Sequence, residues 1–215
     1  MMHILGRLSR VMMACALSVL FLGGTGKTIW AAPAISFTDI AGREVQLDKL
    51  PKTFVVANYI ANFLMVGGAG SLDKVVGMTF DGWEETRYGE YVVYTETFPK
   101  LKANILDSEK ILSLRPDVLL VGRSQFADNN QKIDIFEKAG IKVVVLDYHA
   151  MKVENHTKST MILGQLLDRE AVAKEQCDVY ASALEDVYRK IAALPDSAKH
   201  KTVYMELGNK GIGEY

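Results

Sequence analysis

Two kinds of segment alternate along this chain. Short apolar runs without the every-other-residue polar pattern of a half-exposed strand predict buried strands, and they cover residues 53–58, 75–79, 118–121 and 142–146. Segments with helical spacing lie between them, at 59–66, 109–114 and 132–139. Buried strands separated by helices are typical of a parallel sheet with helices on both faces. We therefore expect one α/β lobe over residues 35–150.

Turn signals mark the ends of several of these segments. Ala41-Gly42 separates two short β-like runs, 35–39 and 43–47, and predicts a hairpin. Asp107 or Ser108 can cap the helix at 109–114. The region 82–104 shows neither period, so we expect it to be irregular.

A long helical region follows the lobe. One helix is expected at 153–167 and a second at 170–194, where apolar residues recur at spacings of four, three, four and three: Tyr180, Leu184, Val187, Ile191 and Leu194. The second helix, about 38 Å long at 1.5 Å per residue, either covers one domain or joins two lobes. We expect 151–195 to be a helical linker. The run 202–207 predicts a strand, and because one strand cannot bury its own faces, 196–215 is expected to begin a second, truncated α/β lobe.

The first 34 residues have the pattern of an export signal. Arg7 and Arg10 precede an apolar stretch at 11–24, which is too short to span a bilayer comfortably. The small residues Ala31, Ala32 and Ala34 offer a cleavage site. We expect an exported, periplasmic protein, with an uncleaved anchor as the alternative.

Composition narrows the functional classes. Apolar residues make up 49% and charged residues 24%, as in a globular protein with a sizeable core. A net charge of −1 argues against nucleic-acid binding. Outside the signal the only cysteine is Cys177, so no intrachain disulfide can form. The sequence contains neither a GxSxG elbow nor an HExxH motif, and we expect no enzymatic activity.

In an open parallel sheet, ligands bind beyond the carboxyl ends of the strands. This rule selects the residues that follow each expected strand, in order Asn58 and Tyr59, Asp81 and Trp83, Arg123 and Ser124, and Tyr148 and His149. Aromatic faces suit a flat or ring-containing ligand, and Arg123 suits a carboxylate, phosphate or chelate anion. Alternatively, Tyr59 and Trp83 pack the lobe surface, Arg123 pairs with Asp128, and His149 is a hydrogen-bonded loop residue.

Six segments, in the same order, resemble one family of transport proteins. They are 39–45 (DIAGREV), 50–56 (LPKTFVV), 68–77 (GAGSLDKVVG), 108–117 (SEKILSLRPD), 136–145 (FEKAGIKVVV) and 163–171 (LGQLLDREA). The family is that of the periplasmic substrate-binding proteins of importers for ferric siderophores, haem and cobalamin. The resemblance implies two α/β lobes joined by one long helix, continuing for roughly another lobe. It also implies that Glu109 docks onto permease arginines, although a carboxylate there favours the helix dipole in any case.

The resemblance also bears on the cargo. Related zinc and manganese binders place histidines after the early strands, whereas Asn58-Tyr59 and Arg123-Ser124 stand there in this chain. A bare transition metal needs several converging His, Cys or carboxylate ligands. A chelated metal, whose coordination sphere is mostly filled, fits better, and we expect neither a protein-bound metal nor a cofactor.

The resemblance therefore implies that the chain is the binding component of an ABC importer. It is expected to act as a monomer, to capture a ferric siderophore or similar iron chelate, and to deliver it to a membrane permease. Haem and cobalamin are alternative cargoes. Other classes remain open: an exported α/β enzyme that uses Asp81 or His149 as acid–base, or a ligand sensor domain. A chain that lacks half of the cleft is expected to bind cargo weakly or not at all.

Overall fold

The computed structural model describes residues 35–80, 100–102, 106–150, 152–199 and 202. Its centre is a five-stranded sheet with the order β5-β4-β3-β6-β7, in which every neighbouring pair is parallel. The strands are β3 (Phe54–Val56), β4 (Val75–Phe80), β5 (Lys100–Lys102), β6 (Val118–Gly122) and β7 (Lys142–Leu146). The predicted parallel sheet is confirmed.

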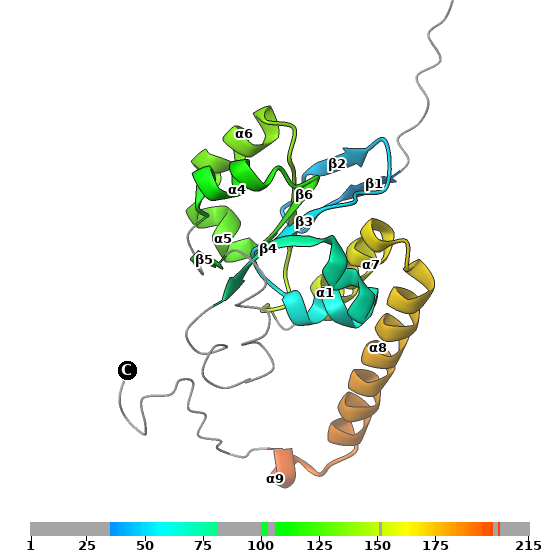
Figure 1. Cartoon of the computed structure of the whole chain (residues 1–215). Helices are drawn as coiled ribbons and strands as arrows, with labels where there is room; N and C mark the ends of the chain where they lie inside the picture. Colours follow the sequence, from blue (N-terminus) through cyan, green and yellow to red (C-terminus); the bar gives the residue numbers. More distant parts are fainter. Residues whose placement is uncertain (1–34, 81–99, 103–105, 151, 200–201, 203–215) are drawn as a thin grey trace, which may run out of the picture. The chain divides into compact units, whose positions relative to one another are not determined.

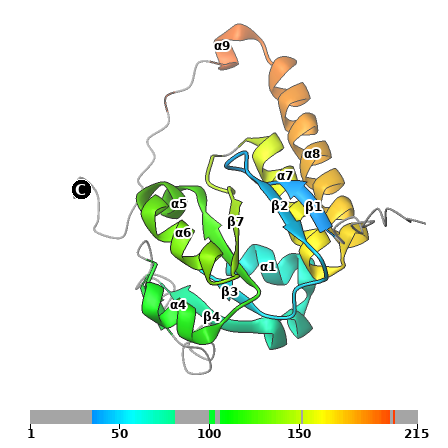
Figure 2. The same ribbon diagram turned by 90° about the horizontal axis from the view of Figure 1, so that it is seen from above.

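Helices cover both faces of this sheet, as expected from its apolar strands (Figures 1 and 2). One face is covered by α1 (Ile60–Gly67) and α7 (Val153–Leu167), and the other by α4 (Ser108–Leu114) and α6 (Asn130–Lys138). Successive side chains of a strand point to opposite faces. Leu120 accordingly packs in the core under α1 and α7, and Leu119 packs in the core under α4 and α6.

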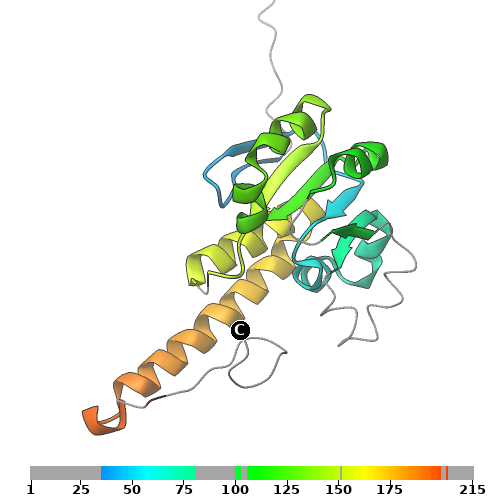
Figure 3. The same cartoon turned by 90° about the vertical axis from the view of Figure 1, so that its left-hand side faces the viewer.

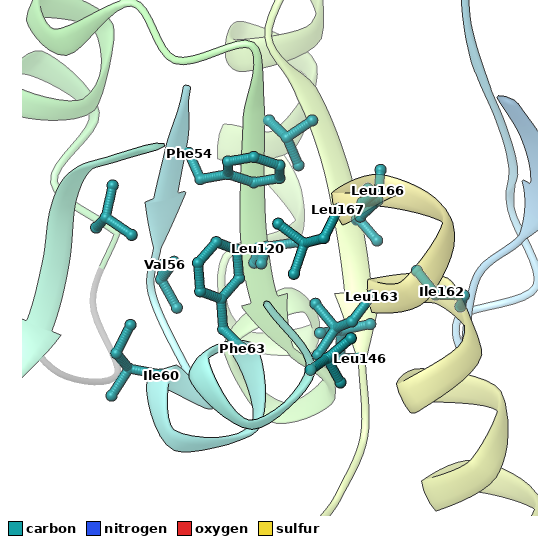
Figure 4. Close-up of a cluster of buried hydrophobic side chains, with 14 of the residues drawn as sticks. Phe54, Val56, Ile60, Phe63, Leu120, Leu146, Ile162, Leu163, Leu166 and Leu167 are labelled. Carbon is teal, nitrogen blue, oxygen red and sulfur yellow. The ribbon is translucent and has the colours of Figure 1, made fainter. Parts of the chain in front are cut away.

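The core under α1 and α7 is built from large side chains that are excluded from solvent. Phe54 of β3 meets Phe63 of α1 edge to face, with ring centroids 5.2 Å apart. Leu163 and Leu166 of α7 complete this cluster, which Figure 4 shows between the strands and the two helices. Burying a side chain of this size stabilises the fold by roughly 1.5–3 kcal/mol.

A hairpin closes the outer side of β7. Its strands β1 (Ile35–Thr38) and β2 (Glu44–Leu47) are antiparallel, as predicted. The buried carboxylate of Asp39 accepts hydrogen bonds from the Arg43 guanidinium and from the Val145 amide of β7. These bonds join the hairpin to the sheet edge.

Three short elements differ from the prediction. Lys100–Lys102 pairs with β4 as the edge strand β5, although 82–104 was expected to be irregular; the rest of that region lies outside the described residues. Arg123–Asp128 forms α5 directly after β6, and Ala69–Lys74 forms a 3₁₀ turn, in two segments for which the sequence predicted no element. Elements of three to six residues are too short to show a hydrophobic period, which explains why the sequence did not reveal them.

The long helix α8 (Glu170–Ala192) runs beside α7, and the short α9 (Asp196–Lys199) follows it (Figure 3). Its first half packs on the lobe through the buried Ala173 and Cys177. Towards the end of this helix and just after it, the side chains of Val187, Ile191 and Leu194 are 44–48% exposed. The described part of the chain therefore does not cover the second half of α8. Within the described ranges, no helix combines the length and apolarity needed to cross a membrane. Of the predicted strand at 202–207, only residue 202 is described.

Candidate functional site

The order of the strands creates a switch point between β3 and β6. The chain forms β3 first, adds β4 and β5 on one side of it, and then returns to add β6 and β7 on the other side. The connections that leave the carboxyl ends of β3 and β6 therefore diverge, which is where open parallel sheets bind their ligands. Asn58 and Tyr59 follow β3, whereas Arg123 and Ser124 follow β6.

Gly122 allows these two strand ends to approach closely. A β-carbon placed on Gly122 would lie 2.6 Å from Asn58 Nδ2 and 3.4 Å from the Tyr59 hydroxyl. Asn58 and Tyr59 are half-buried in this arrangement, whereas Arg123 and Ser124 are exposed. The switch point thus brings residues from the first and third predicted strands together.

Gln125 forms hydrogen bonds to both of these strand ends. Its Nε2 donates to the Ala57 carbonyl after β3 at 2.7 Å, and its Oε1 accepts from the Gly122 amide after β6 at 3.0 Å. Thr79 of β4 also donates to the Ala57 carbonyl. Gln125 is 2% exposed, so these bonds satisfy a buried amide. The sequence did not indicate this role, because one of its two partners is a carbonyl 68 positions earlier in the chain.

Tyr59 has an unusual backbone conformation at the start of α1. Its φ and ψ are 65° and 39°, in the left-handed region that a bulky residue rarely adopts. Its ring makes edge-to-face contacts with Tyr148 and His149, at centroid distances of 5.0 and 5.1 Å. Burial raises the pKa of its phenol. Backbone strain of this kind clusters at functional sites. Here the strained residue lies beside the switch point with its ring half-buried.

The aromatic contacts continue from this edge to α8. His156 of α7 packs edge to face on Tyr148 at 4.8 Å and stacks on Tyr180 of α8 at 3.9 Å. Burial lowers the pKa of His156 and raises that of Tyr148, whose hydroxyl lies 3.2 Å from Thr160 Oγ1. A row of rings therefore joins the carboxyl end of the sheet to the long helix.

Arg123 pairs with a different acid from the one proposed on sequence grounds. Its Nη1 lies 3.9 Å from Oδ2 of Asp147, the residue after β7, rather than beside Asp128. The side chain of Asp147 is 5% exposed and that of Arg123 is 63% exposed. The guanidinium thus remains accessible to a ligand while a buried carboxylate approaches it from one side.

Five of the predicted site residues therefore gather at one edge of the sheet: Asn58, Tyr59, Arg123, Tyr148 and His149. Ser124 lies next to Arg123 on α5, and Asp81 and Trp83 lie outside the described residues. Glu109 is exposed in the first turn of α4, which Asp107 caps by accepting from the Lys110 amide. In the described part of the chain, no three His, Cys, Asp or Glu side chains gather closely enough to hold a metal ion.

Aromatic rings, an amide and an accessible guanidinium lie together at this edge. The rings offer flat apolar contact, and the guanidinium offers several N–H donors to an anion. The profile of the periplasmic binding protein family matches residues 55–215. The chain belongs to this family.

The chain is similar to a relative found by sequence and to several solved structures. YvrC of Bacillus subtilis (strain 168), an uncharacterized ABC transporter substrate-binding lipoprotein, is 25% identical over 173 residues, which are 80% of this chain and 52% of YvrC. Among solved structures, the TroA-like periplasmic binding protein FepB of Veillonella parvula superposes with a TM-score of 0.64 at 22% identity, over 74% of this chain and 50% of FepB.

A second solved structure contains an iron chelate. The siderophore-binding protein BauB, bound to a complex of two acinetobactin molecules with ferric iron, superposes with a TM-score of 0.59 at 19% identity. The match covers 75% of this chain and 55% of BauB. At these identities the solved structures support the fold, and the chain spans about half the length of the relatives it matches.

Proposed function

We propose that this protein is the extracytoplasmic binding component of an ABC importer, which captures a ferric siderophore or similar iron chelate and delivers it to the permease. Family membership supports a binding role, since the match covers residues 55–215. YvrC is named as an ABC transporter lipoprotein, and BauB as a siderophore binder. The protein binds and releases its cargo without bond chemistry.

The observation that carries this proposal is the aromatic and cationic group at the switch point. The ring of Tyr59 is held by Tyr148 and His149, with Arg123 accessible at the neighbouring strand end. A ferric catecholate has a mostly filled coordination sphere and presents aromatic rings and anionic oxygens on its outside. Such a cargo needs stacking surfaces and hydrogen-bond donors more than metal ligands.

The proposal also assigns the parts of the chain. Residues 1–34 serve as the export signal, 35–150 as the first lobe, 151–195 as the helical linker, and 196–215 as the start of a second lobe. The cargo then lies between the carboxyl end of the described sheet and that second lobe. Asp81 and Trp83 belong to the proposed site because they follow β4 in the sequence.

Titration with metal complexes tests the proposal directly. The anionic complex ferric tris(catecholate), haem and cobalamin are each added to the purified protein, and amide chemical shifts report binding even when affinity is low. We expect the ferric complex to bind, and Arg123→Gln to weaken it about tenfold or more, because a charge-assisted hydrogen bond contributes about 1.5–3 kcal/mol. Arg115→Gln, at the opposite end of the sheet, is the matched control. Absence of binding by all three compounds when both proposed lobes are present contradicts the proposal.

Glu109 is the proposed permease contact. Its carboxylate is exposed in the first turn of α4, where it can meet a cationic surface. Glu109→Gln should leave cargo affinity unchanged and reduce uptake by cells that carry the importer. Glu154→Gln, a change in the first turn of α7, is the control. A loss of cargo affinity in Glu109→Gln contradicts the docking role.

A further inference from the structure

We infer that Asp147 is the positioning residue of this site, the group that sets both the loop after β7 and the direction of Arg123. The inference rests on the proposed binding function. Asp147 directly follows β7 and is 4% exposed. A carboxylate at this depth is costly unless polar partners surround it. Its two oxygens have separate partners, so its two roles can be separated experimentally.

The first oxygen shapes the loop that carries the aromatic residues. Oδ1 accepts from the amide of His149 at 3.0 Å and from the amide of Ala150 at 3.1 Å. An aspartate that accepts from the amides two and three residues ahead folds the chain into a tight turn. This turn places the rings of Tyr148 and His149 against Tyr59.

The second oxygen reaches the neighbouring elements. Oδ2 accepts from Asn155 Nδ2 in the first turn of α7 at 2.9 Å and lies 3.9 Å from Arg123 Nη1 at the start of α5. Arg123 is 63% exposed, and fixing its long side chain costs conformational entropy. An acidic partner on one side restricts these rotations and leaves the remaining N–H donors for a ligand.

The backbone of Asp147 is fixed as well. Its amide donates to Oγ of Ser159, a fully buried residue of α7, at 3.0 Å. The carboxylate therefore starts from a rigid position, where strand β7 ends against α7. A change at the side chain should alter the loop and Arg123 while leaving the sheet intact.

Two substitutions separate the two oxygens. Asp147→Asn keeps one acceptor oxygen for the loop amides and replaces the other with a donor that repels the guanidinium. Asp147→Ala removes both acceptors. We expect hydrogen exchange at the amides of His149 and Ala150 to stay slow in Asp147→Asn and to accelerate at least tenfold in Asp147→Ala. Equal exchange in wild type and Asp147→Ala overturns the loop role.

Cargo binding tests the link to Arg123. With ferric tris(catecholate) as the probe, we expect Asp147→Asn to weaken binding about tenfold. In an Arg123→Gln background the same change should have little further effect, because it acts through Arg123. If Asp147→Asn only damages the structure, it should lower the affinity by the same factor in the wild type and in Arg123→Gln. The exposed Asp128→Asn, at the end of α5, controls for the lost charge.

The outcomes distinguish this inference from the proposed function. Unchanged affinity in Asp147→Asn, or a loss that adds fully to that of Arg123→Gln, overturns the positioning of Arg123. If the wild-type protein binds no ferric chelate, the proposed function fails, and the amide exchange of His149 and Ala150 still decides whether Asp147 holds the loop.

Discussion

The two ends of the parallel sheet differ in what their polar side chains do besides satisfying the backbone. At the amino end, the carboxylate of Asp117 accepts from the amides of Lys52 and Thr53 at 2.7 and 3.0 Å, which ties the start of β6 to the start of β3. At the carboxyl end, Arg123 is 63% exposed and Tyr59 adopts a left-handed conformation. Both ends use buried polar groups to satisfy the backbone, Asp117 at one end and Gln125 and Asp147 at the other, but the carboxyl end also presents the accessible Arg123 to a ligand. Stability and binding should therefore respond to different substitutions.

The largest effect on stability is expected at the amino end. Asp117→Ala leaves two amides without their acceptor, and we expect the free energy of unfolding to fall by about 1–2 kcal/mol, with cargo affinity unchanged. Urea unfolding measures the first quantity and titration the second. Asp117→Asn, which keeps an acceptor oxygen, should lose less stability than Asp117→Ala. Weakened cargo binding at full stability would break the comparison between the two ends.

The same carboxylate predicts a dependence on pH. Burial alone raises the pKa of Asp117, but hydrogen bonds from Lys52 and Thr53 outweigh it, so the folded pKa lies below the ordinary value. Its stabilising contribution is present above the unfolded pKa, near 3.9, and is lost as pH falls through the folded value. In Asp117→Ala this part of the acid sensitivity should disappear.

A smaller effect, on binding, is expected at the carboxyl end. In Gly122→Ala the new β-carbon meets Asn58 Nδ2 at 2.6 Å, and the flexible amide must move away. We expect about a five-fold loss of affinity for ferric tris(catecholate) and less than about 1 kcal/mol of lost stability, because only a side-chain tip is displaced. Gly70→Ala, where the β-carbon meets nothing within 4 Å, is the control. If Gly122→Ala lowers the stability but keeps its affinity for the ferric complex, cargo does not bind at this strand end.

The smallest effect concerns the rings between this edge and α8. Tyr148 and Tyr180 enclose His156, and Glu175 lines the same groove; burial lowers the pKa of His156. Below about pH 6.5 the unfolded state therefore binds more protons than the folded state, and the free energy of unfolding should decrease as the pH falls. His156→Phe, which keeps an aromatic ring, should reduce this loss in thermal unfolding between pH 7.5 and 5.5. An unchanged pH profile contradicts burial of the neutral ring.

Most of the fold could be predicted because long, periodic segments carry their own signal. Residues 153–167 form α7, as predicted, and the second long helix ends two residues before the expected boundary. The missed elements β5 and α5 are three and six residues long, and pairing and capping bonds form them rather than a hydrophobic pattern.

The site could be predicted only in part. The rule on strand ends selected Tyr59, Arg123 and His149 correctly as neighbours of the carboxyl edge. The rule did not select Asp147, and although it placed Gln125 after the third strand, it could not reveal the bonds that Gln125 makes, because one of its partners is distant in sequence. Gln125 bonds to a carbonyl 68 positions earlier. Nor does any local pattern indicate that Tyr59 adopts a left-handed conformation.

The most direct test of the binding site uses the paramagnetism of ferric iron. Bound ferric tris(catecholate) should broaden the amide signals of Tyr59, Arg123 and His149 first, while those of Asp117 and Gly140 at the amino end stay sharp. The diamagnetic gallium complex should shift the same signals without broadening them. Broadening that is uniform, or centred on Asp117 and Gly140, would contradict a cargo site at the carboxyl end of the sheet.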